Sequence, residues 1–193
     1  MKYGNIRNIK KETLSKAWYR LYRYTFDYQK EDGEWETQQR ETYDRGNGAA
    51  ILLYNPETSR VVLTRQFRMP TYVNGNPDGM MVEVCAGLLE GDDPESCIIK
   101  EVEEETGYKV EKVEEVFQAY MSPGAVTEKL YFFLAEYNDD MKISAGGGAP
   151  HESEHIEVLE VSFDKALAMI QSGEIIDAKS ILLLQYARIK GVL

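Results

Sequence analysis

AGLLEGDDPESCIIKEVEEETGY, from Ala86 to Tyr108, is the stretch of this 193-residue chain that decides the fold. Residues 94–106 are predicted to form a helix, because the residues on either side suit the two ends of one. Those residues are Asp92 or Asp93 as the N-terminal cap, Pro94 in the first turn and Gly107 directly after the last turn.

Three carboxylates of this helix are predicted to share one side. On a helix of about 3.6 residues per turn, Glu104 and Glu105 follow Glu101 at three and four positions, so all three project together. Ile98 and Val102 fall on a different face, which can turn to the core. Like charges at this spacing repel, and a divalent cation would offset the repulsion. Carboxylate oxygens suit Mg²⁺ or Mn²⁺ better than zinc.

An acidic helix can also be a solvated surface that binds nothing. The turn Ala86–Gly87, just upstream, favours a site. A strand carbonyl at Ala86 could join a metal shell, and a glycine lets the backbone approach a phosphate closely. The sequence therefore predicts a metal and phosphate site where this turn meets the helix.

Charge and composition limit the class of partner. The chain has 22 Lys and Arg against 33 Asp and Glu, a formal net charge of −11. Nucleic acid and membrane surfaces are therefore not expected partners, whereas a small phosphorylated ligand held by a few arginines and a cation is. No apolar run is long enough to cross a bilayer, and the two cysteines are expected to be reduced thiols. The expected location is the cytoplasm.

An antiparallel hairpin is expected near the N-terminus. Aromatic side chains at even spacing there should lie on one buried face of a strand: Trp18, Tyr22, Tyr24, Phe26 and Tyr28. A turn signal at 31–33 and a polar strand over 35–43 complete the hairpin. An isolated hairpin is marginal in water, so it should pack on the rest of the protein or on a second copy, as a homodimer. The predicted division is a β subdomain, residues 1–47, and a main domain, residues 48–193.

The main domain is predicted to be of the α/β class, with helices on both faces of a sheet. Strand-like runs and two closing helices alternate along it. The runs begin at Ala49, Arg60, Met80, Glu114, Lys129 and His155, and the closing helices cover 164–172 and 178–190.

The stretch from Ala86 to Tyr108 resembles the Nudix box, G-x5-E-x7-R-E-U-x-E-E-x-G-U with U apolar. That box marks hydrolases of nucleoside diphosphates linked to another moiety. Its second half is present as KEVEEETGY, residues 100–108, with lysine in place of arginine. The first half departs from it, because Asp93 stands where glutamate is usual and one residue fewer follows. Glu101, Glu104 and Glu105 all remain in place.

The resemblance covers most of the chain, from the aromatic hairpin to the final helix. Pro123 in MSPGAVTE follows Gly107 at a spacing typical of the ADP-ribose and nucleotide-sugar branch of the family. This implies a Nudix-type α/β/α sandwich with a mixed sheet, preceded by an antiparallel β-hairpin subdomain.

The implied activity is Mg²⁺-dependent hydrolysis of the diphosphate of a nucleotide sugar. GDP-mannose, giving GMP and mannose 1-phosphate, is expected first, and ADP-ribose, giving AMP and ribose 5-phosphate, second. Two other classes of function stay open. One is a non-hydrolytic nucleotide-sensing module on the same fold, and the other is a scaffold whose acidic helix is only surface.

The resemblance also implies a metal site. Glu101 and Glu105 would bind Mg²⁺ with the backbone carbonyl of Ala86, and Glu104 would support the cluster. The ion would neutralise the diphosphate, lower the pKa of a coordinated water and align the attacking oxygen.

A carboxylate from a later loop usually joins this site as metal ligand or base. The matching position is Glu154, with Glu152 as its substitute. Three glycines before them, residues 146–148, would let that loop move. Without the resemblance, an ordinary flexible surface loop explains the composition equally well.

Substrate contacts are implied in the same way. The matching positions are Trp18, Arg40, Arg68, Gly87, Glu128 and Lys179. Arginines can grip phosphate oxygens with planar pairs of donors, although each could equally form a surface ion pair. Trp18 stands where relatives present a ring to the base, often from the neighbouring subunit, and packing within a strand is the alternative.

Overall fold

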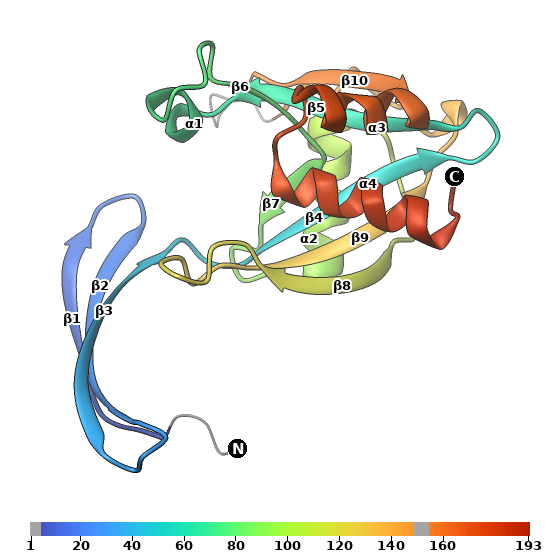
Figure 1. Cartoon of the computed structure of the whole chain (residues 1–193). Helices are drawn as coiled ribbons and strands as arrows, with labels where there is room; N and C mark the ends of the chain where they lie inside the picture. The colour runs from blue at the N-terminus through green and yellow to red at the C-terminus, as the bar shows by residue number, and fades with distance from the viewer. Residues whose placement is uncertain (1–4, 149–154) are drawn as a thin grey trace. The chain divides into compact units, whose positions relative to one another are not determined.

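The structure is a computed structural model that describes residues 5–148 and 155–193 (Figure 1). Two compact units make up the chain. The first holds the described residues before Gly48 together with Tyr120–Lys129, and the second holds Gly48–Ala119 and Leu130–Leu193. The segment Tyr120–Lys129, which the predicted division gives to the main domain, thus groups with the first unit. Among the described residues, no helix combines the length and apolar character needed to span a membrane.

The first unit is built on an antiparallel sheet of three strands in the order β1-β2-β3. They are β1 (Ile6–Lys16), β2 (Arg20–Gln29) and β3 (Trp35–Asp44). The expected hairpin is β2 with β3, and its turn contains Gly33 at a φ of 86°. The additional strand β1 was not predicted, because its sequence IRNIKKETLSK is mostly polar and almost wholly exposed, so it shows no alternation.

The aromatic side chains of this sheet are less buried than their spacing predicts. Tyr22 is 7% exposed, but the other aromatic residues of β2 are only half-buried. Trp18 does not lie on the strand at all. It occupies the turn between β1 and β2 and is 89% exposed. The described part of this unit contains no helix, and Lys11 of β1 lies over the Tyr22 ring, 3.5 Å from its centroid.

The segment Tyr120–Lys129 closes the first unit by pairing with the end of β3. The backbone N–H of Tyr43 donates to the Ala125 carbonyl at 2.7 Å, and the Thr127 N–H donates to the Tyr43 carbonyl at 3.0 Å. These bonds tie the MSPGAVTE motif to the N-terminal sheet.

The second unit contains a sheet of seven strands in the order β10-β5-β4-β9-β8, with β6 beside β5 and β7 beside β4. β4 and β9 run parallel, whereas β4 pairs antiparallel with β5 and β7, so the sheet is mixed, as predicted. The strands are β4 (Gly48–Asn55), β5 (Arg60–Phe67), β6 (Met80–Glu83), β7 (Cys85–Leu88), β8 (Glu114–Tyr120), β9 (Lys129–Glu136) and β10 (Glu157–Ser162).

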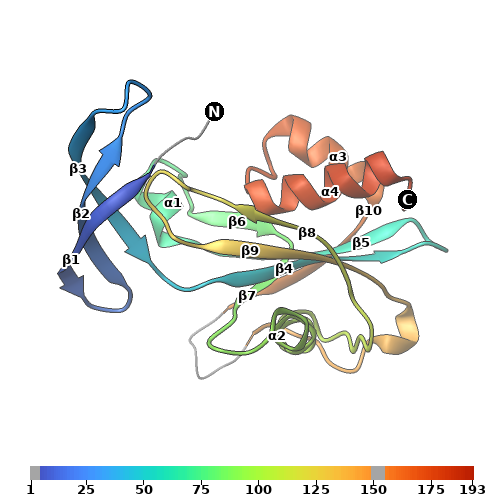
Figure 2. The ribbon, with the colours of Figure 1, turned by 90° about the horizontal axis from the view of Figure 1, so that it is seen from below.

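Helices cover both faces of this sheet, which confirms the predicted architecture. Figure 2 shows α2 on one face and α3 and α4 on the other. Their bounds are α2 (Pro94–Glu101), α3 (Phe163–Ser172) and α4 (Ala178–Lys190), with a short α1 (Met69–Val73) after β5 and a 3-10 turn at Asp139–Met141. The core lies where α2 packs on β4 and β9, through Ile51, Ile98, Val102 and Phe133, each no more than 2% exposed.

The run MMVEVCA, predicted as one strand, is divided at Val84. β6 before it pairs with β5, and β7 after it pairs with β4. At the break, the Val84 N–H leaves the sheet and donates to the Ser180 hydroxyl at 2.8 Å. Because of this change of pairing partner, Glu83 is the last residue of β6 and Ala86 lies on β7.

Candidate active site

The carboxylate helix begins as predicted but ends differently. The Asp93 side chain accepts from the Ser96 N–H at 3.1 Å, and this hydrogen bonding lowers the pKa of Asp93. After Glu101 the α-helix becomes a π-helical turn, Val102–Thr106, which ends at Gly107 with a φ of 75°. Asp93, which stands where the box usually has glutamate, is therefore the N-terminal cap of the helix.

Two of the three box carboxylates meet the Ala86–Gly87 turn. A Cβ added to Gly87 would sit 2.0 Å from Glu101 Oε1, so this carboxylate lies directly against the glycine backbone. Glu105 is only 2% exposed, and its Oε2 accepts from the Ala86 N–H at 3.3 Å. The glycine is therefore needed to let a carboxylate approach the strand.

Glu104, the third box carboxylate, is exposed, whereas Glu105 is buried. The Glu104 side chain is 40% exposed and lies 3.9 Å from Lys100 Nζ. Glu104 and Glu105 both lie on the π turn, which closes i→i+5 rather than i→i+4 hydrogen bonds and so advances less around the axis per residue. On such a turn, a residue four positions on lies more nearly in line with the first residue than it does on an α-helix.

Negative charge is concentrated between β7 and this helix. Burial raises the pKa of the Cys85 thiol well above its ordinary value, and the nearby charges of Glu105 and Glu101 raise it further. The charges of both carboxylates thus act on β7, the strand that carries Ala86. Cys85 is a buried free thiol, as expected.

The glycines expected to mobilise a loop form a cap on the π turn. The Gly147 N–H donates to the Glu105 carbonyl at 2.8 Å, and the Gly148 N–H donates to the Glu104 carbonyl at 3.1 Å. Ile156 N–H in turn donates to the Gly147 carbonyl at 3.2 Å. The candidate ligand or base Glu154, with Glu152 as its substitute, lies outside the described residues.

The donors at the turn suit a hard divalent cation. Glu101, Glu105 and the Ala86 carbonyl are all oxygen donors, and such sets favour Mg²⁺-like ions that keep several waters. Over 5–148 and 155–193, no three His, Cys, Asp or Glu side chains come together as a complete metal site. The described residues therefore supply part of a site.

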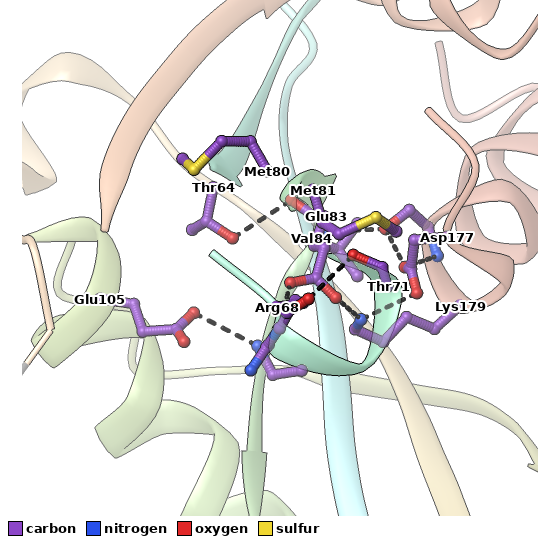
Figure 3. A network of polar contacts seen from close by, with 12 residues as sticks. Thr64, Arg68, Thr71, Met80, Met81, Glu83, Val84, Glu105, Asp177 and Lys179 are labelled. Carbon is purple, nitrogen blue, oxygen red and sulfur yellow. Dashed lines mark hydrogen bonds and ion pairs between the residues drawn. The ribbon is translucent and has the colours of Figure 1, made fainter. Parts of the chain in front are cut away.

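Arg68 and Lys179 converge on one buried carboxylate, as Figure 3 shows. Glu83 Oε2 accepts from Arg68 Nε at 2.8 Å, and Glu83 Oε1 accepts from Lys179 Nζ at 2.5 Å. The Glu83 side chain is 5% exposed and that of Lys179 is 12% exposed. Lys179 Nζ also pairs with Asp177 Oδ1 at 3.0 Å.

A second part of this network fixes the start of α4. Asp177 caps the helix by accepting from the Ser180 N–H at 2.9 Å, and it also accepts from the Ser180 hydroxyl at 2.5 Å. The same hydroxyl accepts from Val84 N–H. Sequence reasoning missed Glu83, Asp177 and Ser180. The available signal was Glu83, a charged residue inside an apolar run, because a buried carboxylate requires a partner.

The other predicted substrate contacts belong to the first unit. Arg40, on β3, lines a cavity of about 620 Å³ together with Tyr120 and the Pro123–Thr127 loop. Its Nη1 donates to the Gln39 carbonyl at 2.7 Å, and its Nη2 donates to Gln38 Oε1 at 2.9 Å.

Glu128 is 9% exposed and lies 3.4 Å from Arg45 Nη1. Arg45 was not predicted, and its buried Nε has no hydrogen-bond partner among the described residues. Trp18 meets Tyr19 edge-on, with ring centroids 6.4 Å apart. Its exposure of 89% argues against packing within a strand as its role.

Known proteins resemble the chain along nearly its whole length. A NUDIX domain model matches residues 44–184, and a model described as the GDP-mannose pyrophosphatase NudK N-terminal domain matches residues 5–43. A protein of Yersinia enterocolitica serotype O:8 / biotype 1B named GDP-mannose pyrophosphatase is 57% identical over 188 residues, 97% of each chain. A protein of the same name from Cronobacter sakazakii is 52% identical over 98% of each chain.

Among solved structures, a crystal structure of an ADP compounds hydrolase aligns with a TM-score of 0.70 over 100% of this chain and 98% of the other. Its sequence is 16% identical, so this likeness supports the fold alone. Three findings agree on the family: the box carboxylates at the glycine turn, the mixed sheet between helices, and the relatives that match nearly the whole chain. This chain is a member of the Nudix family, whose hydrolases need a divalent metal.

Proposed function

We propose that this protein hydrolyses the diphosphate bond of a nucleotide sugar, GDP-mannose first, to GMP and mannose 1-phosphate. The observation that carries hydrolysis is the convergence of Glu101 and Glu105 on the Ala86–Gly87 turn. The choice of substrate rests on the names of relatives that are 52–58% identical over nearly the whole chain. Water is the second reactant: its hydroxyl joins one phosphorus, and its other proton goes to the oxygen released from the second.

The proposed metal is Mg²⁺, with Mn²⁺ as a possible replacement. Glu101, Glu105 and the Ala86 carbonyl would hold it, with Glu104 in support and Glu154 as a further ligand or base. When bound, the ion supplies positive charge to the diphosphate and lowers the pKa of a water. Glu105 is suited to this because burial keeps its carboxylate away from bulk water.

Arg68 and Lys179 would also hold the diphosphate. The Nε of Arg68 is bound by Glu83, so its two terminal nitrogens are the groups that would meet phosphate oxygens. Lys179 gives two of its three donors to Glu83 and Asp177, which leaves one for substrate. The Gly87 backbone would lie alongside.

Arg40, Glu128 and Trp18 would recognise the nucleoside. The cavity beside Arg40 supports this role, because aromatic, small and charged residues line it together. Trp18 would stack on the base, since an exposed ring in a turn is available for such a contact.

We further propose a homodimer that forms through the sheet β1–β3 and lets Trp18 of the second copy complete each site. The support is that this sheet keeps Ile6 and Ile9 53% and 62% exposed, with no helix in its own described unit to cover them. Reduced cysteines agree with a cytoplasmic protein. Light scattering across a concentration series tests the dimer, and a monomer at every concentration would refute it.

Substrate choice is tested with a panel of GDP-mannose, ADP-ribose and UDP-glucose at saturating Mg²⁺. We expect the highest kcat/KM for GDP-mannose, with GMP and mannose 1-phosphate as the only products. Hydrolysis in ¹⁸O-labelled water identifies the attacked phosphorus. A higher kcat/KM for ADP-ribose would transfer the proposal to that substrate. Binding without turnover would instead indicate a sensing module.

A further inference from the structure

Glu83 divides its two carboxylate oxygens between two cations from different parts of the fold. Oε2 meets Arg68, which directly follows β5, and Oε1 meets Lys179, in the first turn of α4. With Asp177 as the second acceptor for Lys179, the group contains two positive and two negative charges. The cluster is therefore electrically balanced before any ligand arrives.

The geometry leaves one end of Arg68 available. Glu83 takes the Nε–H, and no described residue accepts a hydrogen bond from Nη1 or Nη2. The Arg68 side chain is 38% exposed, whereas its partner is 5% exposed. A planar guanidinium held at Nε by a fixed acceptor has a fixed plane, so its terminal N–H groups have a fixed direction.

Stability alone does not account for this arrangement. Burying a carboxylate is costly, and well-packed apolar residues commonly hold two elements together as well as a buried ion pair does. β6 and α4 are in any case joined through the Ser180 hydroxyl and the Val84 N–H. A second link between these elements thus exists beside the ion pairs of Glu83.

We propose that Glu83 is a positioning residue: it holds the Arg68 guanidinium in the orientation that binds the diphosphate. The inference rests on the proposed function. Glu83 touches no substrate atom, and its effect is transmitted through Arg68. If Glu83 had a purely structural role, replacing it would lower the stability of the protein. The effects on kcat/KM of replacing Glu83 and of replacing Arg68 would then be independent of each other.

The test is a double-mutant cycle with Glu83→Gln, Arg68→Ala and the double variant, assayed with GDP-mannose and Mg²⁺. We expect Glu83→Gln to lower kcat/KM by about 10²-fold, mostly through KM, because an Arg68 guanidinium in the wrong orientation binds the diphosphate less tightly. Arg68→Ala should lose as much or more, and the double variant should be no worse than Arg68→Ala. Multiplicative losses would overturn the proposal.

Glu160→Gln is the matched control. Arg60 Nε lies 3.0 Å from Glu160 Oε1 in the same Nε–carboxylate arrangement, with Glu160 33% exposed, and Arg60 begins the strand that Arg68 follows. Its kcat/KM should stay within about twofold of the wild type. An equal loss in this control would show that any broken ion pair impairs the enzyme, and would overturn the assignment of Glu83.

Guanidinium rescue covers the case in which Glu83→Gln fails to fold. Free guanidinium should restore part of the activity of Arg68→Ala, because Glu83 can dock it, and methylammonium should restore less. No preference for guanidinium would contradict the proposal.

Wild-type controls separate this inference from the proposed function. If the wild type hydrolyses no nucleotide sugar, the proposed function fails. GDP affinity is then measured by calorimetry across the same cycle. Non-additive losses in affinity support the positioning role, whereas additive losses or no GDP binding overturn it.

Discussion

Glu101 lies against Gly87 so closely that a Cβ on the glycine would sit 2.0 Å from the carboxylate oxygen and 2.4 Å from its Cγ. The Glu101 side chain therefore fills the space beside Gly87 at the place where the metal is proposed to bind. A methyl group is enough to separate them. The atoms in conflict belong to a flexible side chain, so the conflict should displace the carboxylate and leave the backbone in place.

Gly87→Ala is expected to lower kcat by about 10²-fold and to raise the Mg²⁺ concentration needed for half-maximal rate, because Glu101 is displaced. The midpoint of thermal unfolding should change little. In a Glu101→Ala background the same substitution should cost almost nothing more. A full additional loss there would mean that Gly87 acts by another route.

Glu101→Gln and Glu105→Gln should each lower kcat by about 10³-fold at saturating Mg²⁺, because each removes a charged metal ligand. Circular dichroism and the unfolding midpoint check that the fold survives. Glu103→Gln is the control, since that exposed residue on the same turn is assigned no role. Rates near those of the wild type in either ligand variant would contradict the metal assignment.

Trp18→Ala should raise KM about tenfold or more with little change in kcat, because base stacking contributes about 1–3 kcal/mol to binding. At 89% exposed, the side chain contributes little to stability, so the unfolding midpoint should not move. Mixing Trp18→Ala with Glu101→Gln tests the contribution of the second copy. Mixed dimers contain one intact site, so activity at low substrate should exceed the sum of the separate samples. A strictly additive result would place Trp18 in its own subunit's site.

Ser180→Ala should lower the free energy of unfolding by about 1–3 kcal/mol, because the Val84 N–H would lose its buried acceptor. Ser172→Ala, at the end of α3, removes a more exposed hydroxyl and should cost less. Urea denaturation measures both. Equal losses would show that the Val84 hydrogen bond has no special importance.

The alkaline limb of stability should depend on Tyr54. Burial and the neighbouring charge of Glu136 raise the pKa of Tyr54 to about 12. In the unfolded chain this phenol ionises near its ordinary pKa, about 10, so above that pH the folded state holds more protons than the unfolded state. The contribution of Tyr54 is therefore complete below pH 10 and is lost as the pH rises toward 12.

Tyr54→Phe should flatten this decline in denaturation curves between pH 10 and 12, although Tyr137, whose pKa is also raised, will keep part of it. A slope identical to that of the wild type would show that Tyr54 does not titrate with folding.

The sequence predicted the parts of the fold that have a local cause. Asp93, Gly107 and the two closing helices were recognisable because caps and helix ends depend on neighbouring residues. Strand β1 was missed because its side chains do not alternate. The break at Val84 depends on a hydroxyl on a distant helix, which no local pattern records.

In the candidate site, too, the residues with a local sequence signal could be predicted and those that depend on distant elements could not. Glu101 and Glu105 lie against the turn that the motif singles out, whereas nothing in EVEEET indicates the π turn that carries Glu104 and Glu105. Arg68 and Lys179 were named as separate contacts. Their common partner Glu83 could be found only once β6 and α4 were placed in space.

The closing segment of the first unit has an evolutionary consequence. Because Tyr120–Lys129 interrupts the Nudix sequence and returns to pair with Tyr43, the boundary between the two family models, after residue 43, does not separate two independent modules. A shortened protein starting at Gly48 would leave the Ala125 carbonyl and Thr127 N–H without their strand. Recombination that exchanged the N-terminal sheet alone would thus break the loop carrying Pro123, so the sheet and the MSPGAVTE loop are expected to be inherited as a pair.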